Sequence, residues 1–245
     1  MKAQRLFQQG ELQWIVLGRD PAKPDYVIDT NEYLIVHQGR GLLMDPGGTE
    51  IFPEVVNGIS EYCSVDSIDH IFGSHQDPDI LSSLSLWLSV CPQAKIHVPW
   101  VWTGFITHFG CDQSSMVPVP DEGGEIDVAG HRVQLIPAHY LHSSGNLHLY
   151  DPTAKILFSG DVGAALMPEA DAPLVVKDFD AHTAYMETFH RRWMPSNRAR
   201  DQWLERVRAL DIDMLCPQHG AIFKGDDVQR FFDWFEGLEL GCASN

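Results

Sequence analysis

Ser74-His75-Gln76-Asp77-Pro78-Asp79-Ile80 places one imidazole and two carboxylates directly after an apolar run that predicts a β-strand over residues 68–72. Three later segments put further imidazoles and a carboxylate into short loops after apolar or β-branched residues: Leu141-His142-Ser143, Ser159-Gly160-Asp161 and Pro217-Gln218-His219-Gly220. Together the four segments offer three imidazoles and three carboxylates, a ligand inventory for two metal ions. Zinc sites lean on His and Cys, whereas mixed imidazole and carboxylate shells with open positions suit iron or manganese.

The order of these segments resembles the metallo-β-lactamase superfamily, and within it the flavodiiron proteins and the shorter oxygen-binding di-iron proteins. The superfamily's first motif reads His-x-His-x-Asp-His, and the di-iron branch has an acidic residue in place of the second His. This chain reads His75-Gln76-Asp77-Pro78-Asp79-Ile80 at that place. The resemblance covers roughly residues 33–235. It implies an α/β fold, the metallo-β-lactamase-like αββα four-layer sandwich, as a single domain over residues 1–245.

The resemblance also implies a ligand set for each of two metals. The first metal is expected to be held by His75, Asp77, His142 and a bridging Asp161. The second is expected to be held by Asp79, Asp161 and His219. No catalytic residue beyond these ligands is predicted.

Ile80 is a departure from the superfamily pattern, because it stands where the first motif has a last His that can ligate the second metal. An aliphatic side chain donates no lone pair. The second metal is therefore expected to keep three protein ligands and an open position for oxygen, peroxide or water, and a weakened or lost second metal is the other interpretation. His139 competes with His142 as a ligand, and the family spacing to Asp161 favours His142.

Other polar residues are weaker candidates for a role near the metals. Asp45 resembles an acid that supports the ligands from the end of the sheet, and its plainer interpretation is a turn residue before Pro46. His148 and His190 are candidates for hydrogen bonding to the ligands, although a structural role is favoured for both.

Composition excludes several classes of partner. Acidic residues outnumber basic ones by 34 to 17, which gives a formal net charge of −17, and such a surface repels the phosphates of nucleic acids. No apolar run is long enough to span a bilayer, so no membrane partner is expected. The five cysteines show no C-x-x-C spacing and indicate reduced thiols in a cytoplasmic protein.

Alternating apolar patterns predict the main elements of the fold. Strands are expected at residues 33–36, 41–44, 68–72, 94–99, 131–137, 147–150, 156–158 and 212–215. Helices are expected at residues 81–90, 201–210 and 226–238. The aromatic residues Trp100, Trp102, Phe105 and Phe109 are expected to pack together.

The resemblance favours a non-haem di-iron protein that binds dioxygen or a related diatomic or peroxide ligand, as an oxygen or iron sensor or an oxygen-binding protein. Two Fe ions are the implied cofactor, with Zn or Mn as alternatives. An oxidoreductase that reduces dioxygen is left open. Because no phosphate-binding loop for a flavin is visible, electrons would come from a separate donor.

Two other functions are compatible with the same motifs. One is a zinc-dependent hydrolase that acts on an ester, thioester or phosphoester through a metal-bound hydroxide. Asp77 and Ile80, each in place of a His, argue against it. The other is a metal-dependent interaction protein without turnover that reports its ligand state to a signalling partner. A homodimer is left open.

Overall fold

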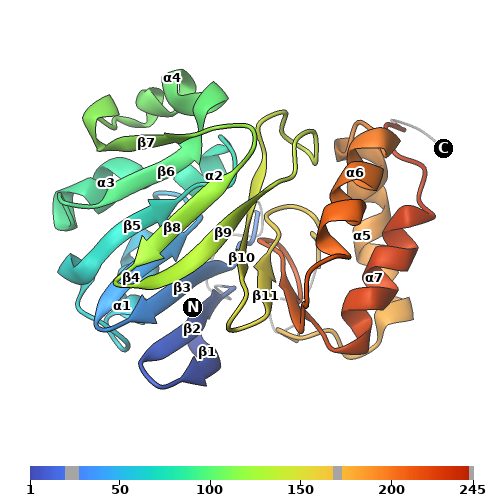
Figure 1. Cartoon of the computed structure of the whole chain (residues 1–245), viewed down its shortest axis with the longest axis horizontal. Coiled ribbons are helices and arrows are strands. Elements are labelled where there is room, and N and C mark those ends of the chain that lie inside the picture. The colour runs from blue at the N-terminus through green and yellow to red at the C-terminus, as the bar shows by residue number, and fades with distance from the viewer. Residues whose placement is uncertain (20–27, 168–172, 243–245) are drawn as a thin grey trace. The chain divides into compact units, whose positions relative to one another are not determined.

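The structure is a computed structural model that describes residues 1–19, 28–167 and 173–242. The chain forms two compact units, Met1–Val133 and Gln134–Asn245 (Figure 1). Each unit has its own buried apolar cluster. The expectation of a single domain over residues 1–245 stays a prediction.

The first unit is built on a seven-stranded sheet with the order β1-β2-β3-β4-β5-β6-β7. Its strands are β1 Lys2–Gln9, β2 Leu12–Gly18, β3 Glu32–His37, β4 Arg40–Met44, β5 Ile68–Phe72, β6 Lys95–Pro99 and β7 Met116–Val119. Strands β1 to β4 pair antiparallel, and β4 to β7 pair parallel. Since the last paired residues of β4 and β5 are Met44 and Phe72, the segments that follow these strands start side by side.

Helices and short turns cover this sheet: α1 Phe52–Ile59, α2 Pro78–Leu81, α3 Leu84–Val90 and α4 Thr103–Ile106. The apolar cluster beneath them includes Trp87, Ile15 and Leu34, all fully buried. At Gly58 of α1 an added Cβ would come within 2.3 Å of the Leu17 side chain, so this helix packs closely on β2.

The helix predicted for residues 81–90 is confirmed over α3, Leu84–Val90, but the chain breaks before it and Leu81 belongs to α2. Ser83 lies at the break and its hydroxyl donates to the carbonyl of Gly47 at 2.6 Å. A serine hydroxyl that bonds backbone outside the helix competes with helical continuation. The break leaves α2 as one short turn that begins within the His75 segment.

The expected aromatic cluster forms only in part. Trp102 and Phe105 meet edge to face at 5.3 Å, and Trp102 and Phe109 pack against the core of the first unit. Trp100 and Phe105 instead have exposed fractions of 52% and 62%.

The second sheet has the order β13-β12-β11-β10-β9-β8. Its strands are β8 Gly124–Val128, β9 His131–Pro137, β10 Leu147–Asp151, β11 Ile156–Phe158, β12 Met214–Cys216 and β13 Phe223–Lys224. Within the second unit, β11 and β12 are the parallel pair, with Phe158 opposite Cys216. The loops that follow these two strands therefore leave the sheet together.

Three helices of the second unit lie side by side in Figure 1: α5 Phe179–Trp193, α6 Asn197–Val207 and α7 Asp226–Glu236. Asp178 and Ser196 cap α5 and α6 by accepting backbone N–H groups at 3.2 Å each. The sequence did not predict α5. Its buried face carries Phe179, Met186 and two histidines. Because histidine counts as polar in a sequence pattern, the apolar periodicity of this helix is hidden in the sequence.

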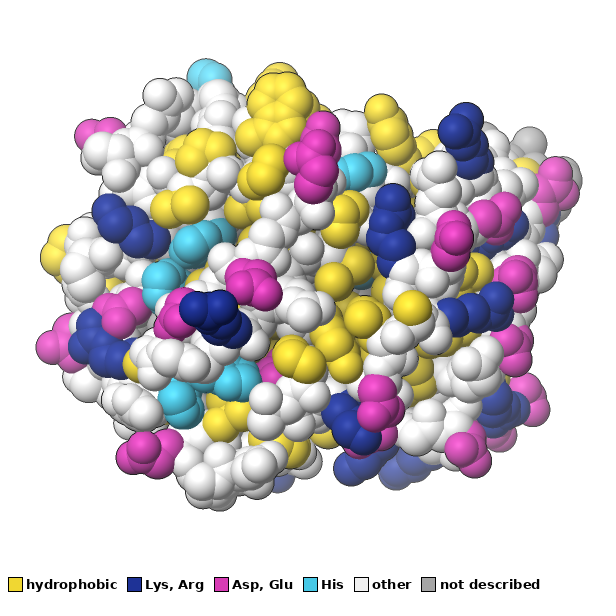
Figure 2. Space-filling view, viewed as in Figure 1, with side chains coloured by type: hydrophobic (Ala, Val, Ile, Leu, Met, Phe, Trp, Pro, Cys, Tyr) yellow, Lys and Arg dark blue, Asp and Glu magenta, His cyan; other side chains and the backbone are white. Residues whose placement is uncertain are grey.

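Charged side chains of both signs are mixed on the face of the molecule that Figure 2 shows. No helix of the described residues has the length and apolar character needed to cross a membrane.

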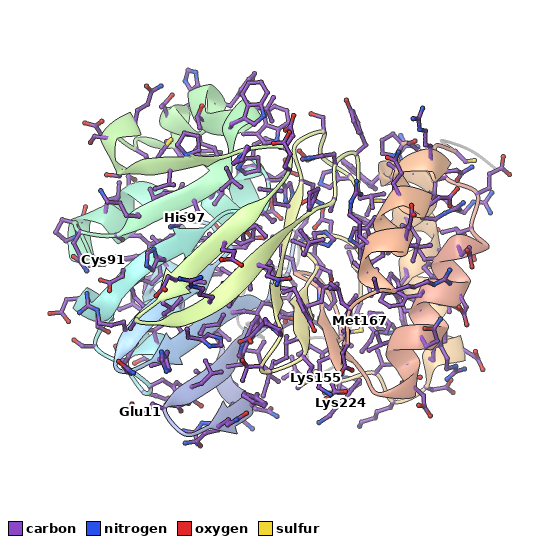
Figure 3. The ribbon with its side chains drawn as sticks, viewed as in Figure 1. Glu11, Cys91, His97, Lys155, Met167 and Lys224 are labelled. Carbon is purple, nitrogen blue, oxygen red and sulfur yellow. The ribbon has the colours of Figure 1, made fainter. Side chains whose placement is uncertain are left out.

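Buried histidines are a recurring feature of both cores. In the first unit the Nδ1 atom of His70 lies 3.0 Å from the Nε2 atom of His97, which Figure 3 labels on β6. Burial lowers the pKa of His97 to about 4. In the second unit burial likewise lowers the pKa of His182 and His190 to about 4. All three imidazoles are therefore neutral near pH 7.

These histidines predict how the stability of the metal-free protein depends on pH. The unfolded chain takes up protons near the ordinary His pKa of 6.5, whereas the folded chain takes them up only near pH 4. The stabilisation from the neutral buried imidazoles is thus fully present above pH 6.5 and is lost as the pH falls towards 4. Urea unfolding at pH 7.5 and 5.5 should show this fall. His97→Gln should reduce it, while the exposed His108→Gln should not; equal pH dependence in His97→Gln and the parent would contradict the assignment.

The core of the second unit gives a second prediction. Phe231 is fully buried, stacks on Phe235 at 5.6 Å and meets Phe223 at 4.9 Å. Phe231→Ala should lower the free energy of unfolding by about 3–5 kcal/mol, because it removes a large buried side chain and leaves a cavity. The matched control is Phe105→Ala on the surface, with an expected change within about 0.5 kcal/mol. Chemical denaturation of both variants provides the measurement.

Candidate metal site

The end of β5 carries the first group of candidate ligands. The buried Asp45 carboxylate, just after β4, accepts the backbone N–H of Ser74 at 2.7 Å and the Ser74 hydroxyl at 2.6 Å. The Ser74 hydroxyl oxygen lies 2.8 Å from Nδ1 of His75. Since the hydroxyl proton is donated to Asp45, His75 donates its Nδ1 proton to Ser74. The Nε2 lone pair of His75 is thereby left for a metal.

Asp77 lies next to that lone pair. Its Oδ2 atom is 3.5 Å from Nε2 of His75, and its Oδ1 atom accepts from the Gln76 amide at 2.8 Å. Asp77 is the residue before α2, and Asp79 lies in the first turn of this helix. The segment therefore carries one imidazole and two carboxylates over five residues.

Ile80 is fully buried and belongs to the apolar core of the first unit. Its carbonyl accepts the backbone N–H of Gly47 at 2.9 Å. The residue therefore ties the His75 segment to the Asp45 turn. The open coordination position expected from Ile80 stays a prediction.

In the second unit Asp161 lies between two imidazoles. Its Oδ2 atom is 2.7 Å from Nε2 of His142, and its Oδ1 atom is 3.3 Å from Nε2 of His219. All three side chains are largely buried. Each carboxylate oxygen thus faces a different imidazole, an arrangement compatible with a carboxylate that bridges two metals.

Backbone hydrogen bonds hold the Asp161 and His219 loops together. The N–H of Gln218 donates to the carbonyl of Gly160 at 2.8 Å, and the N–H of Ala165 donates to the carbonyl of His219 at 3.1 Å. The N–H of Ser159 also donates to the carbonyl of Cys216 at 3.0 Å. These bonds continue the parallel pairing of β11 and β12, so the relative position of Asp161 and His219 follows from strand register.

Buried polar groups surround the His142 loop. The Asn146 amide nitrogen donates to the carbonyl of Leu141, immediately before His142. The indole N–H of Trp203 donates to Nδ1 of His148 at 3.0 Å, and Nε2 of His148 lies 3.3 Å from the Asn146 amide nitrogen. His142 itself meets the half-exposed Trp193 edge to face at 5.7 Å.

The structure brings together the predicted residues within each unit. His75 and Asp77 meet in the first, and His142, Asp161 and His219 meet in the second. The contact of His142 with Asp161 favours His142 over His139, although the complete ligand set stays a prediction. Sequence reasoning missed Ser74 and Asn146, whose polar side chains sit within four residues of a ligand in the chain.

The donor set fits transition metals. Buried carboxylates that face imidazole nitrogens need a cation to compensate their charge, either a proton or a metal. Imidazole and carboxylate donors of this mixture suit iron, manganese or zinc. The hydrogen bond behind His75 also fixes the tautomer that metal binding requires.

Comparison with known proteins assigns the family. A family model described as ODP family beta lactamase matches residues 28–220. The chain belongs to the ODP family. The predicted resemblance to the di-iron branch of the metallo-β-lactamase superfamily is thereby confirmed, as is the metallo-β-lactamase-like α/β fold with two sheets.

Solved structures of the chemotaxis sensor ODP are similar over nearly the whole chain. One, described as its peroxy diiron species, has 43% identity and a TM-score of 0.88, covering 98% of this chain and 97% of that one. Its apo state from T. denticola has 42% identity and a TM-score of 0.89, covering 98% and 96%.

More distant relatives are longer than this chain. A variant of the flavo di-iron protein from Thermotoga maritima has 22% identity and a TM-score of 0.80, and the match covers 96% of this chain but 60% of that one. This likeness shows the fold alone. An uncharacterized protein of Methanocaldococcus jannaschii is 22% identical over 236 residues, with 94% of this chain covered. The chain spans 58% of the length of that relative.

The hydrogen bonds behind His75 predict a role for Asp45 in metal binding. Asp45→Asn preserves the shape of the side chain and tolerates the positive φ of 44° at this position. The amide cannot accept both Ser74 bonds, so the orientation of Ser74 and the tautomer of His75 are no longer fixed. The affinity for Co²⁺ should fall about 10–100-fold. Competition with a chromophoric chelator measures the Co²⁺ affinity, and the exposed Asp112→Asn is the control. An unchanged affinity in Asp45→Asn would refute this role of Asp45.

Proposed function

We propose that this protein is a non-haem di-iron protein that binds dioxygen and acts as an oxygen sensor or oxygen-binding protein. The observation that carries the proposal is the similarity, at 43% identity and over nearly the full length of both chains, to a structure described as the peroxy diiron species of a chemotaxis sensor. The contacts within each unit support it, because both units supply imidazole and carboxylate donors.

The proposed ligands divide between two iron ions. His75, Asp77 and His142 hold the first, Asp79 and His219 hold the second, and Asp161 bridges them. The bridging role is supported by the two Asp161 oxygens, which face different imidazoles. The three carboxylates balance most of the charge of two divalent ions, and a small anionic ligand can supply the rest.

Reduced iron at such a centre supplies the electrons that dioxygen needs in order to bind tightly. The protein's own side chains orient the proposed ligands and exclude water from some of them. Asp45 and Ser74 hold His75 in one tautomer, while the bonds between the Asp161 and His219 loops keep these ligands in register. The buried side chains of His142, Asp161 and His219 keep bulk water away from their donor atoms.

Iron is favoured over a hydrolytic zinc centre by the acid-rich donor set. A zinc hydrolase generates its nucleophile at an open position within a His-rich shell. Asp77 and Ile80 take two positions that are His in the superfamily motif. A carboxylate in place of an imidazole makes the shell harder and better suited to iron.

The partners follow from this assignment. Dioxygen is the ligand, and a separate electron donor returns the centre to its reduced state. A signalling partner reads the ligand state, and the protein acts in the cytoplasm as a homodimer or a monomer. All five cysteines are free thiols, which supports a reducing compartment.

Metal analysis tests the proposal. The protein purified without oxygen from iron-replete cells should hold about two irons per chain and should gain a visible absorption band when air is admitted. Asp161→Ala should lose both irons, whereas Asp79→Ala should lose mainly one. The exposed Asp66→Ala serves as the control and should keep the parent's iron content. Stoichiometric zinc without iron would support the hydrolase instead, and parent-like iron in Asp161→Ala would exclude the bridge.

A further inference from the structure

His190 is a fully buried histidine near the end of α5. Aromatic side chains surround its ring, with centroids of Phe235, Trp234 and Phe231 at 5.3, 5.4 and 6.0 Å. Such a pocket would accept an apolar side chain at no desolvation cost, whereas a buried imidazole must have both of its nitrogens hydrogen-bonded.

Both nitrogens of His190 do have partners. The Nδ1 atom lies 2.9 Å from the carbonyl oxygen of Met186, one turn earlier in α5, and donates its proton to it. The Nε2 atom is then an acceptor, and it receives the backbone N–H of Gly163 at 3.0 Å. Because both partners are backbone groups of fixed type, the neutral tautomer is determined. Burial supports this state by lowering the pKa of His190 to about 4.

Gly163 belongs to the loop that carries Asp161. Its φ of +97° is a conformation that favours glycine, and an added Cβ would come within 3.1 Å of both Leu215 and Phe223. Within the same loop, the N–H of Val162 donates to Ser159 and that of Ala164 donates to the carbonyl of Asp161. The side chain of His190 thus bonds α5 to this turn.

We infer that His190 is a positioning residue for the Asp161 carboxylate. By accepting the N–H of Gly163, it holds the turn in the orientation that directs one carboxylate oxygen at His142 and the other at His219. The inference rests on the proposed bridging role of Asp161, and it predicts a specific signature. A displaced bridge weakens both metals together, whereas loss of a terminal ligand such as Asp79 weakens mainly one.

Substitutions of His190 that differ in side-chain length test the inference. In His190→Gln the amide oxygen can occupy the place of Nε2 and accept the Gly163 N–H. In His190→Asn the side chain is one carbon shorter and does not reach it. His190→Leu fills the pocket without any acceptor. Phe232→Leu is the control, because it removes buried aromatic packing from the core of the same unit without touching the His190 hydrogen bonds.

The measurements are stepwise Co²⁺ affinity by chelator competition, the visible spectrum of the Co²⁺ protein, and urea unfolding of the metal-free protein. His190→Leu and His190→Asn should lower both Co²⁺ affinities by about 10–100-fold and change the spectrum. His190→Gln should retain both affinities and the spectrum. Phe232→Leu should lose stability but keep the parent's spectrum and affinities. If His190→Leu does not fold, the comparison of His190→Asn with His190→Gln tests the inference by itself.

The inference is overturned if Asn and Gln at this position bind Co²⁺ equally well, or if only one of the two affinities changes. If the parent protein binds two Co²⁺ and all His190 variants bind Co²⁺ with the same affinities, the inference is wrong and the proposed function is unaffected. If the parent protein binds neither Co²⁺ nor iron, the inference and the proposed function are both wrong.

Discussion

The contact of one buried carboxylate with two imidazoles is the interaction on which the proposed metal centre depends. Asp161 directs its two oxygens at His142 and His219, and these three side chains come from three separate loops of the second unit. Buried groups of this kind are costly unless a cation or proton compensates the carboxylate. Metal binding and the folded arrangement of these loops should therefore stabilise each other.

The proposed metal ligands of the two units are supported by the same physical means. In the first, the Asp45 carboxylate and the Ser74 hydroxyl orient His75 from behind. In the second, His190 accepts a backbone N–H of the turn that carries Asp161. In both cases a buried, hydrogen-bonded polar group supports a loop that carries a proposed metal ligand. Such support is what makes a site on loops rigid enough to hold metals.

Membership of the ODP family places the chain beside proteins in which a di-iron centre is linked to sensing. The match to the chemotaxis sensor spans nearly all of both chains, whereas the match to the flavo di-iron protein covers 60% of that longer chain. A sensor has to bind its ligand and hold it long enough to be read, which rapid turnover would prevent. The burial of the proposed metal ligands His75, Asp161 and His219 is consistent with a centre built for binding.

The sequence by itself determined the types of the candidate metal ligands, the family and much of the two sheets. The strands at residues 68–72, 131–137 and 156–158 have the predicted bounds, because short apolar runs between turn signals specify strands locally. It did not determine α5, whose buried face includes His182 and His190, nor the break at Ser83. These features depend on partners distant in the chain. Only the tertiary structure decided that Asp161 faces two imidazoles, that Ser74 connects Asp45 to His75, and that His190 is bonded to Gly163, since each contact joins residues brought together by strand pairing and helix packing.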